Sequence, residues 1–227
     1  MTLLDGYAAV VTGAATPLGA ATALELARCG ARVALADRER PEETADRITR
    51  AGGTAHALAY ESGDQESTAA LLDTAAQLLG GVDLVVTGAF GPAGGDPVWD
   101  AVFGERVRGT WLVLAAARPH LARSPRGNAV VLTPGSAWRG EPGALPEVSA
   151  AGGLLGLVRA VAREVGDDGT RVNLVGFDED TADAGQRCLK GDSAPADVAA
   201  AVALLASPRA GFVTGQTLLA NGGSHFN

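Results

Sequence analysis

The stretch VVTGAATPLGAATALELARCGARVALADR, residues 10–38, contains the pattern that decides the fold. It reads as a buried strand, a turn that runs from Gly13 to Gly19, a helix, a second buried strand and an acidic residue, Asp37. In a dinucleotide fold, this order places a pyrophosphate on the helix N-terminus and lets the carboxylate bind ribose hydroxyls. The stretch therefore predicts an α/β fold that starts with a nucleotide-binding type of turn.

The rest of the chain continues the same alternation. Short, nearly continuous apolar runs are typical of strands buried on both faces, and the longer stretches between them have helical spacing. We expect strands at residues 7–12, 32–36, 54–59, 83–87, 128–133, 171–175 and 217–220, and helices at 17–29, 41–51, 66–80, 99–122, 144–165 and 195–206. This predicts a Rossmann-like, doubly wound, mainly parallel seven-stranded sheet in the order 3-2-1-4-5-6-7, with three helices on each face. Residues 1–227 are expected to form a single domain, because no linker or repeat interrupts them.

Composition excludes several classes of protein. The net charge of −8 argues against nucleic acid or an anionic membrane as a partner. Two cysteines cannot make a disulfide framework, and no apolar run approaches the ~20 residues of a bilayer span. We therefore expect a cytoplasmic protein. With three histidines and two distant cysteines, we expect no metal site.

Several landmarks resemble the short-chain dehydrogenase/reductase family. The turn resembles its TGxxxGxG motif, and ERVRGT (105–110), RVN (171–173), ADVA (196–199) and TGQTLLANGG (214–223) match later motifs in order. The resemblance implies the same fold and a bound nicotinamide dinucleotide. The residues that it assigns to that cofactor are Gly13, Thr16, Leu18, Gly19, Asp37, Arg38 and Glu61.

The turn departs from the family at Pro17, which replaces the middle glycine. Proline has no N–H and adds bulk where the backbone normally approaches the phosphates. Thr16 as N-cap with Pro17 at the first helical position is also a good helix start by itself. We expect no cofactor or weak NAD(H) binding; Asp37 would favour NAD over NADP, while the neighbouring Arg38 weakens that preference.

The resemblance implies a catalytic tetrad of Asn, Ser, Tyr and Lys, in which the Tyr donates a proton and the Lys follows four residues later. The chain has two tyrosines, Tyr7 and Tyr60, and one lysine, Lys190. Neither tyrosine is followed by a lysine at the fourth position, so no Tyr-x-x-x-Lys motif exists. Alignment to the family's motifs places the tetrad positions at Arg106, Pro134, Glu147 and Ala151. The family's Pro-Gly after the sixth strand, close to the nicotinamide, is Phe177-Asp178 here, and the segment that follows is shorter.

The replacements could still form a different site. Glu147 and Arg106 are expected to face the same cleft, as an acid/base pair or, alternatively, as a structural ion pair. Ser136 and Ser149 lie nearby in the sequence, but no histidine is expected to accompany them. The three histidines are assigned to a helix end (His120), the third strand (His56) and the C-terminal tail (His225).

The sequence also bears on assembly into oligomers. The resemblance implies packing between copies through the helices at 99–122 and 144–165, and SAAGGLLGLVRAVA (149–162) is rich in small residues that let helices approach closely. Simple Ala/Gly enrichment from a GC-rich genome is the alternative explanation. Three functions remain open: a non-catalytic subunit that partners an active ketoreductase of this family, an atypical NAD(P)-dependent reductase with water or substrate as proton donor, and a non-redox biosynthetic enzyme (dehydratase, cyclase or isomerase) that uses Glu147. Nothing in the sequence names a substrate.

Overall fold

The computed structural model describes residues 2–88, 99–178, 187–190 and 193–226. Its centre is one sheet of seven parallel strands in the order β3-β2-β1-β4-β5-β6-β7, which confirms the predicted order. The strands are β1 (Ala8–Thr12), β2 (Arg32–Asp37), β3 (Ala55–Ala59), β4 (Leu84–Gly88), β5 (Asn128–Pro134), β6 (Arg171–Phe177) and β7 (Thr217–Ala220).

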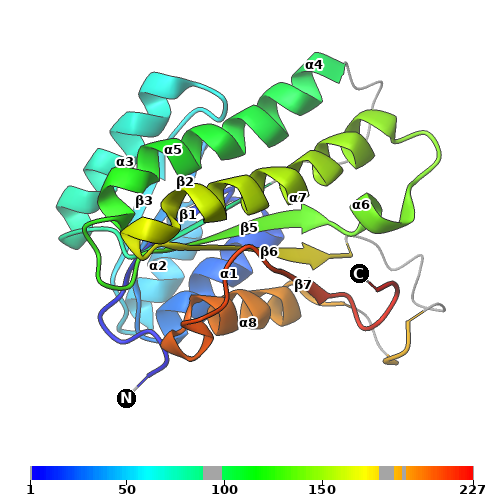
Figure 1. Cartoon of the computed structure of the whole chain (residues 1–227). Helices are drawn as coiled ribbons and strands as arrows, with labels where there is room; N and C mark the ends of the chain where they lie inside the picture. Colours follow the sequence, from blue (N-terminus) through cyan, green and yellow to red (C-terminus); the bar gives the residue numbers. More distant parts are fainter. Residues whose placement is uncertain (1, 89–98, 179–186, 191–192, 227) are drawn as a thin grey trace.

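Helices cover both faces of this sheet, as Figure 1 shows. One layer contains α1 (Pro17–Arg28), α2 (Glu42–Arg50) and α8 (Pro195–Ala206), and the other contains α3 (Gln65–Leu79), α5 (Gly109–Leu121) and α7 (Leu145–Val165). The prediction of three helices on each face is confirmed. Because all strands are parallel, their carboxyl ends meet at one edge of the sheet, where ligands bind in open α/β folds.

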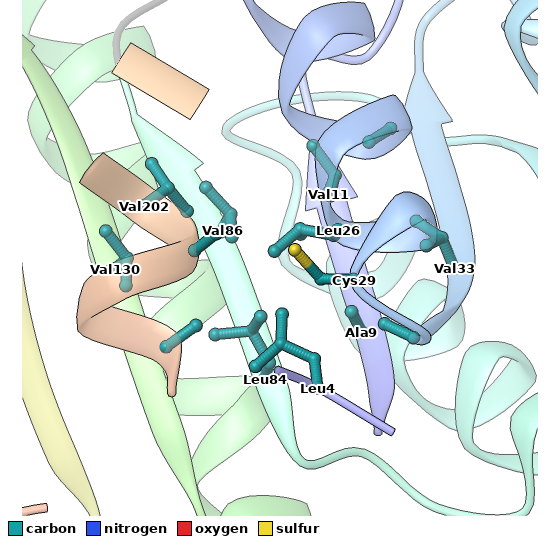
Figure 2. Close-up of a cluster of buried hydrophobic side chains, with 14 of the residues drawn as sticks. Leu4, Ala9, Val11, Leu26, Cys29, Val33, Leu84, Val86, Val130 and Val202 are labelled. Carbon is teal, nitrogen blue, oxygen red and sulfur yellow. The ribbon is translucent and has the colours of Figure 1, made fainter. Parts of the chain in front are cut away.

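The apolar core is divided between the two faces of the sheet. Alternate strand residues such as Val11 and Val86 pack with α1 and α8, whereas Val10 and Val85 pack with α3, α5 and α7. Figure 2 shows the first cluster, in which Cys29 lies among apolar side chains. Both cysteines are free thiols; Cys29 is buried and Cys188 is exposed. The five inner strands of the sheet are thus buried on both sides, as their continuous apolar runs predict, whereas the edge strands β3 and β7 are only half-buried.

Two local features differ from the prediction. The helix expected at 99–122 consists of a short α4 (Trp99–Val102), a π-helical segment η1 (Phe103–Arg108) and α5. A short helix α6 (Ser136–Arg139) follows β5, where no helix is expected. Single π-helical turns are often found at functional sites, and η1 contains Arg106 at one of the tetrad positions.

The sequence predicts no segment with the length and hydropathy of a membrane span, but one helix of the structure has both. Residues Leu145–Asp168, which include α7 and the 3₁₀ turn η2 (Gly166–Asp168), are by length and composition apolar enough to cross a membrane, since they contain an 18-residue window with a mean hydropathy of 1.3. Ala and Gly contribute most of the residues between the leucines, so no single apolar run stands out in the sequence. This helix packs on the sheet as part of the α3–α5–α7 layer. Core helices of proteins without a membrane span can have the same length and apolar composition.

Candidate functional site

The turn between β1 and α1 has the shape of a nucleotide-binding turn. Gly13 adopts a positive φ of 68°, which favours glycine. A Cβ at Gly19 would lie 2.1 Å from the carbonyl oxygen of Gly13, so the helix packs directly against the turn and only glycine fits there. Both glycines that the sequence assigns to this turn are therefore required by its geometry.

The start of α1 is closed by its own cap. The hydroxyl of Thr16 accepts the N–H of Gly19 at 3.1 Å and donates to the carbonyl of Gly13 at 2.7 Å. Pro17 occupies the first helical position, which has no N–H to offer. An N–H group that could bind a phosphate is thus bonded to Thr16, and another is missing.

Asp37 ends β2 beside this turn, where a ribose is expected. Its two carboxylate oxygens accept the backbone N–H groups of Ala15 at 2.9 Å and of Arg38 at 2.7 Å. The side chain is therefore aimed at the turn and is already hydrogen-bonded within the chain. It can still accept from a hydroxyl, since each carboxylate oxygen has two lone pairs.

Arg38 and Glu61 form a two-pronged ion pair. The guanidinium donates to the Glu61 carboxylate through Nη2 at 2.5 Å and Nε at 3.0 Å, and both side chains are largely exposed. The sequence assigns each residue separately to a nucleotide, but the pairing of β2 with β3 brings them together. The positive charge of Arg38 is thereby neutralised on the surface.

The four tetrad positions lie around the carboxyl end of β5. Pro134 ends β5, Glu147 lies in the first turn of α7, Ala151 lies one turn further along the same helix, and Arg106 lies in η1. Helix α7 contacts η1, since a Cβ at Gly153 would meet the side chain of Val107 at 3.6 Å. The structure therefore places α7 against η1, the segment that contains Arg106.

Glu147 and Arg106 do not form the expected ion pair. Both side chains are buried, but the ion pairs between described residues do not include one that joins them. Oε2 of Glu147 is buried without a hydrogen-bond partner, which is costly for a carboxylate. No contact between described residues supports the structural ion pair that the sequence leaves open, and Glu147 is a buried acid with an unused acceptor.

A second polar cluster lies at the same edge and is missed by the sequence analysis. Asp178 follows β6 and is buried, and the Ser224 hydroxyl donates to its Oδ2 at 2.6 Å. The imidazole Nδ1 of His225 lies 2.9 Å from the Ser224 hydroxyl. Arg139 and Arg187 approach the Asp178 carboxylate at 3.7 Å and 3.8 Å. His225 is thus part of a buried constellation, whereas its place near the chain end suggests only a tail residue.

The pKa directions in this part of the chain follow from burial. Burial lowers the pKa of the His225 imidazole, an effect that Asp178 opposes and Arg139 reinforces. Burial also raises the pKa of the Tyr7 and Tyr60 phenols. A raised pKa is the opposite of what a proton-donating tyrosine beside a lysine requires. Lys190 is exposed, and no described part of the chain groups three His, Cys, Asp or Glu side chains for a metal ion.

Comparison with known sequences and structures identifies the family. Residues 13–225 match the sequence family described as Enoyl-(Acyl carrier protein) reductase. The chain belongs to the short-chain dehydrogenase/reductase family. A short-chain alcohol dehydrogenase structure from Sinorhizobium meliloti, titled as putative, superposes with a TM-score of 0.90 at 28% identity and covers 97% of each chain.

Relatives in this family include named reductases and dehydrogenases. The chain is 29% identical to 3-oxoacyl-[acyl-carrier-protein] reductase FabG of Staphylococcus aureus, over 96% of this chain and 97% of that protein. It is also 29% identical to the (2S)-[(R)-hydroxy(phenyl)methyl]succinyl-CoA dehydrogenase subunit BbsD of Thauera aromatica, over 97% of both proteins. A Burkholderia cenocepacia short-chain dehydrogenase, solved in complex with NADP, is 26% identical with a TM-score of 0.87 and covers 98% of this chain and 99% of its own. The chain therefore aligns with these proteins over nearly its whole length and has the same fold.

Compared with the family's site, the site of this chain has one part that is largely retained and one part that is altered. The turn keeps two of the family's glycines, Gly13 and Gly19, and the acidic residue Asp37, while Pro17 replaces the middle glycine. At the tetrad positions, the side chains are a guanidinium, a pyrrolidine ring, a carboxylate and a methyl group. The shortened segment after Asp178 lies partly outside the described residues.

Proposed function

We propose that this chain is a non-catalytic subunit that partners an active nicotinamide-dependent ketoreductase of the same family. The observation that carries the proposal is the pair Glu147 and Ala151, which lie one turn apart on the buried face of α7. At these two positions the resemblance calls for a phenol and an ammonium group. A carboxylate and a methyl group cannot give the same proton or hold the nicotinamide ribose.

The helix surface supports an assembly role. The side chains of Trp111 on α5 and Leu145 on α7 are 48% and 70% exposed, and Leu155 and Leu157 are partly exposed on the same helix. Gly156 is exposed, and a Cβ there would meet nothing within 4 Å. An apolar helix face with small residues suits close helix packing, and obligate interfaces bury about 2,000 Å² or more. The Thauera relative is itself named as a subunit of a dehydrogenase.

Three features of the site support weak or absent NAD(H) binding. Pro17 lacks an N–H at the turn, and Thr16 uses the N–H of Gly19. Asp178 places a buried carboxylate at the family's position close to the nicotinamide. If a dinucleotide binds, the carboxylate of Asp37 disfavours the 2′-phosphate of NADP. We further propose a cytoplasmic location, in line with the acidic composition.

Glu147 supports one alternative function. Its buried Oε2 has no hydrogen-bond partner, and a desolvated carboxylate of this kind can accept a proton from a substrate. The chain would then catalyse a non-redox step such as a dehydration or isomerisation. The effect of Glu147→Gln on any measured reaction distinguishes this alternative from the subunit role.

The experiment for the subunit role is co-expression with short-chain reductases encoded next to this chain, followed by size-exclusion chromatography. We expect the tagged chain to elute together with such a reductase at the size of a hetero-oligomer. A chain that elutes as a monomer, or only with copies of itself, contradicts the proposal.

A further inference from the structure

The C-terminal segment Asn221–Phe226 is tied to the carboxyl ends of β5 and β6. After β7, Ser224 donates to Asp178, which directly follows β6, and the N–H of Gly223 donates to the side chain of Asn221 at 3.0 Å. The carbonyl of Gly222 accepts the N–H of Leu189 at 2.9 Å. The chain end is therefore held by contacts to two other parts of the molecule.

The ring of His225 stands in space that two glycines leave open. A Cβ at Gly135, the residue after β5, would lie 2.5 Å from Cε1 of His225. A Cβ at Gly176 in β6 would lie 2.9 Å from the ring of Trp138, and that ring stacks on His225 with centroids 5.7 Å apart. The two rings thus fill the volume above the ends of β5 and β6, and any larger residue at either glycine would displace them.

The contacts of this segment combine good and poor interactions. The short bond from Ser224 to Asp178 satisfies one oxygen of a carboxylate that is 1% exposed. Oδ1 of Asp178 and Nε2 of His225 are buried without hydrogen-bond partners. A buried polar atom without a hydrogen bond costs about 1–3 kcal/mol, and for Oδ1 of Asp178 the ion pair with Arg139 at 3.7 Å offsets part of this cost. The segment is therefore held by several contacts, but its hydrogen bonding is incomplete.

His225 and Trp138 lie at the edge of the sheet where ligands bind in this family. Asp178 stands at the family's position next to the nicotinamide, and Gly135 follows the position of the catalytic serine. Atoms of His225 and Trp138 already occupy the space there. A ligand that approaches this edge meets the chain's own C-terminus.

We propose that Asn221–Phe226 is an internal plug, which seats His225 over Gly135 and closes the carboxyl ends of β5 and β6 to small molecules. The plug involves contacts within one chain only. It therefore does not depend on the proposed subunit role, and either proposal can fail without the other.

Hydrogen–deuterium exchange on the full chain tests the plug. Two variants release it: a deletion of residues 224–227, and Ser224→Ala, which removes the bond to Asp178. The matched control is Phe226→Ala, because this side chain belongs to the same segment but is 74% exposed. In both release variants, we expect the amides of residues 135–140 and 187–190 to exchange about tenfold faster than in the unaltered chain, and the control to match the unaltered chain.

Trp138 provides a second measurement. In a background with Trp99→Phe and Trp111→Phe, its emission is expected to shift to longer wavelength in both release variants, because water reaches the ring. Circular dichroism checks that each variant is folded; if the deletion unfolds the chain, Ser224→Ala alone decides. Unchanged exchange at residues 135–140 in a folded release variant overturns the proposal, whatever the tryptophan emission shows.

Discussion

Glu147 and Ala151 lie four residues apart on the buried face of α7, with 5% and 1% of their surfaces exposed. Residues at this spacing share one face of a helix, so the chain keeps the geometry that would bring a tyrosine and a lysine together. It does not keep the two side chains. A helix retained with its catalytic groups replaced is expected where the fold is needed for something other than hydride transfer.

The first prediction concerns the unpaired carboxylate of Glu147. Glu147→Met is expected to raise the free energy of unfolding by about 1 kcal/mol at neutral pH, because an apolar side chain of similar length removes a desolvated charge. Urea unfolding measures the difference. The control Glu141→Met alters an exposed acid and should change stability by less than about 0.5 kcal/mol. A stability loss at Glu147 would mean that its carboxylate is favourably paired in the folded chain.

The second prediction separates assembly from folding at Gly156. A Cβ at Gly156 meets no atom of the described residues within 4 Å, and glycine costs a helix interior about 1 kcal/mol relative to better helix formers. We therefore expect a folded variant that is no less stable as a single chain but fails to assemble, as measured by size-exclusion chromatography. Ala69→Leu, on the exposed side of α3, serves as the control and should assemble normally. Normal assembly of Gly156→Leu would exclude this face of α7 from the interface.

The third prediction concerns the cofactor. Calorimetry with NADH is expected to show no saturable binding at micromolar concentration. Pro17→Gly returns the middle glycine of the turn and should improve affinity by at most about tenfold, or ~1.4 kcal/mol, because Asp178 still opposes the cofactor. Micromolar binding by the unaltered chain would show that the dinucleotide half of the site is functional.

The fourth prediction concerns pH and the C-terminal segment. Burial lowers the pKa of His225 below its ordinary value of 6.5. The charge of Asp178 raises this pKa, and the charge of Arg139 lowers it. Arg187 also faces the Asp178 carboxylate. The docked state then binds fewer protons than the released state, so docking is fully stabilised above pH 6.5 and weakens as pH falls through the lowered pKa. Hydrogen exchange at residues 135–140, corrected for the intrinsic effect of pH, should quicken in this window. His225→Gln should remove the pH dependence; if it persists, another group is responsible.

The sequence predicts the fold in detail because the signals for it are local. The strand order, the two helix layers and the turn from Gly13 to Gly19 all follow from apolar runs, helical spacing and motifs in chain order. The break at η1 and the short α6 are not predicted, since a π-helical turn and a four-residue helix leave no distinct periodicity.

The candidate site is predicted only where motifs mark its residues. Alignment finds Arg106, Pro134, Glu147 and Ala151, but it cannot show that Glu147 lacks an ion pair, which depends on side-chain orientation. Ser224 and Asp178 are 46 residues apart in the chain, so their hydrogen bond has no local signal. Only the acid at the family's Pro-Gly position hints that this end of β6 is different.

The most direct test of the central claim is the reduction rate of a co-purified complex with an active short-chain reductase, measured with two single replacements. Replacing the partner's motif tyrosine with phenylalanine should abolish turnover, while Glu147→Gln in this chain should leave the rate within about twofold of the original, which corresponds to ~0.4 kcal/mol. Turnover that survives the first replacement and is lost with the second would show that this chain is itself the enzyme.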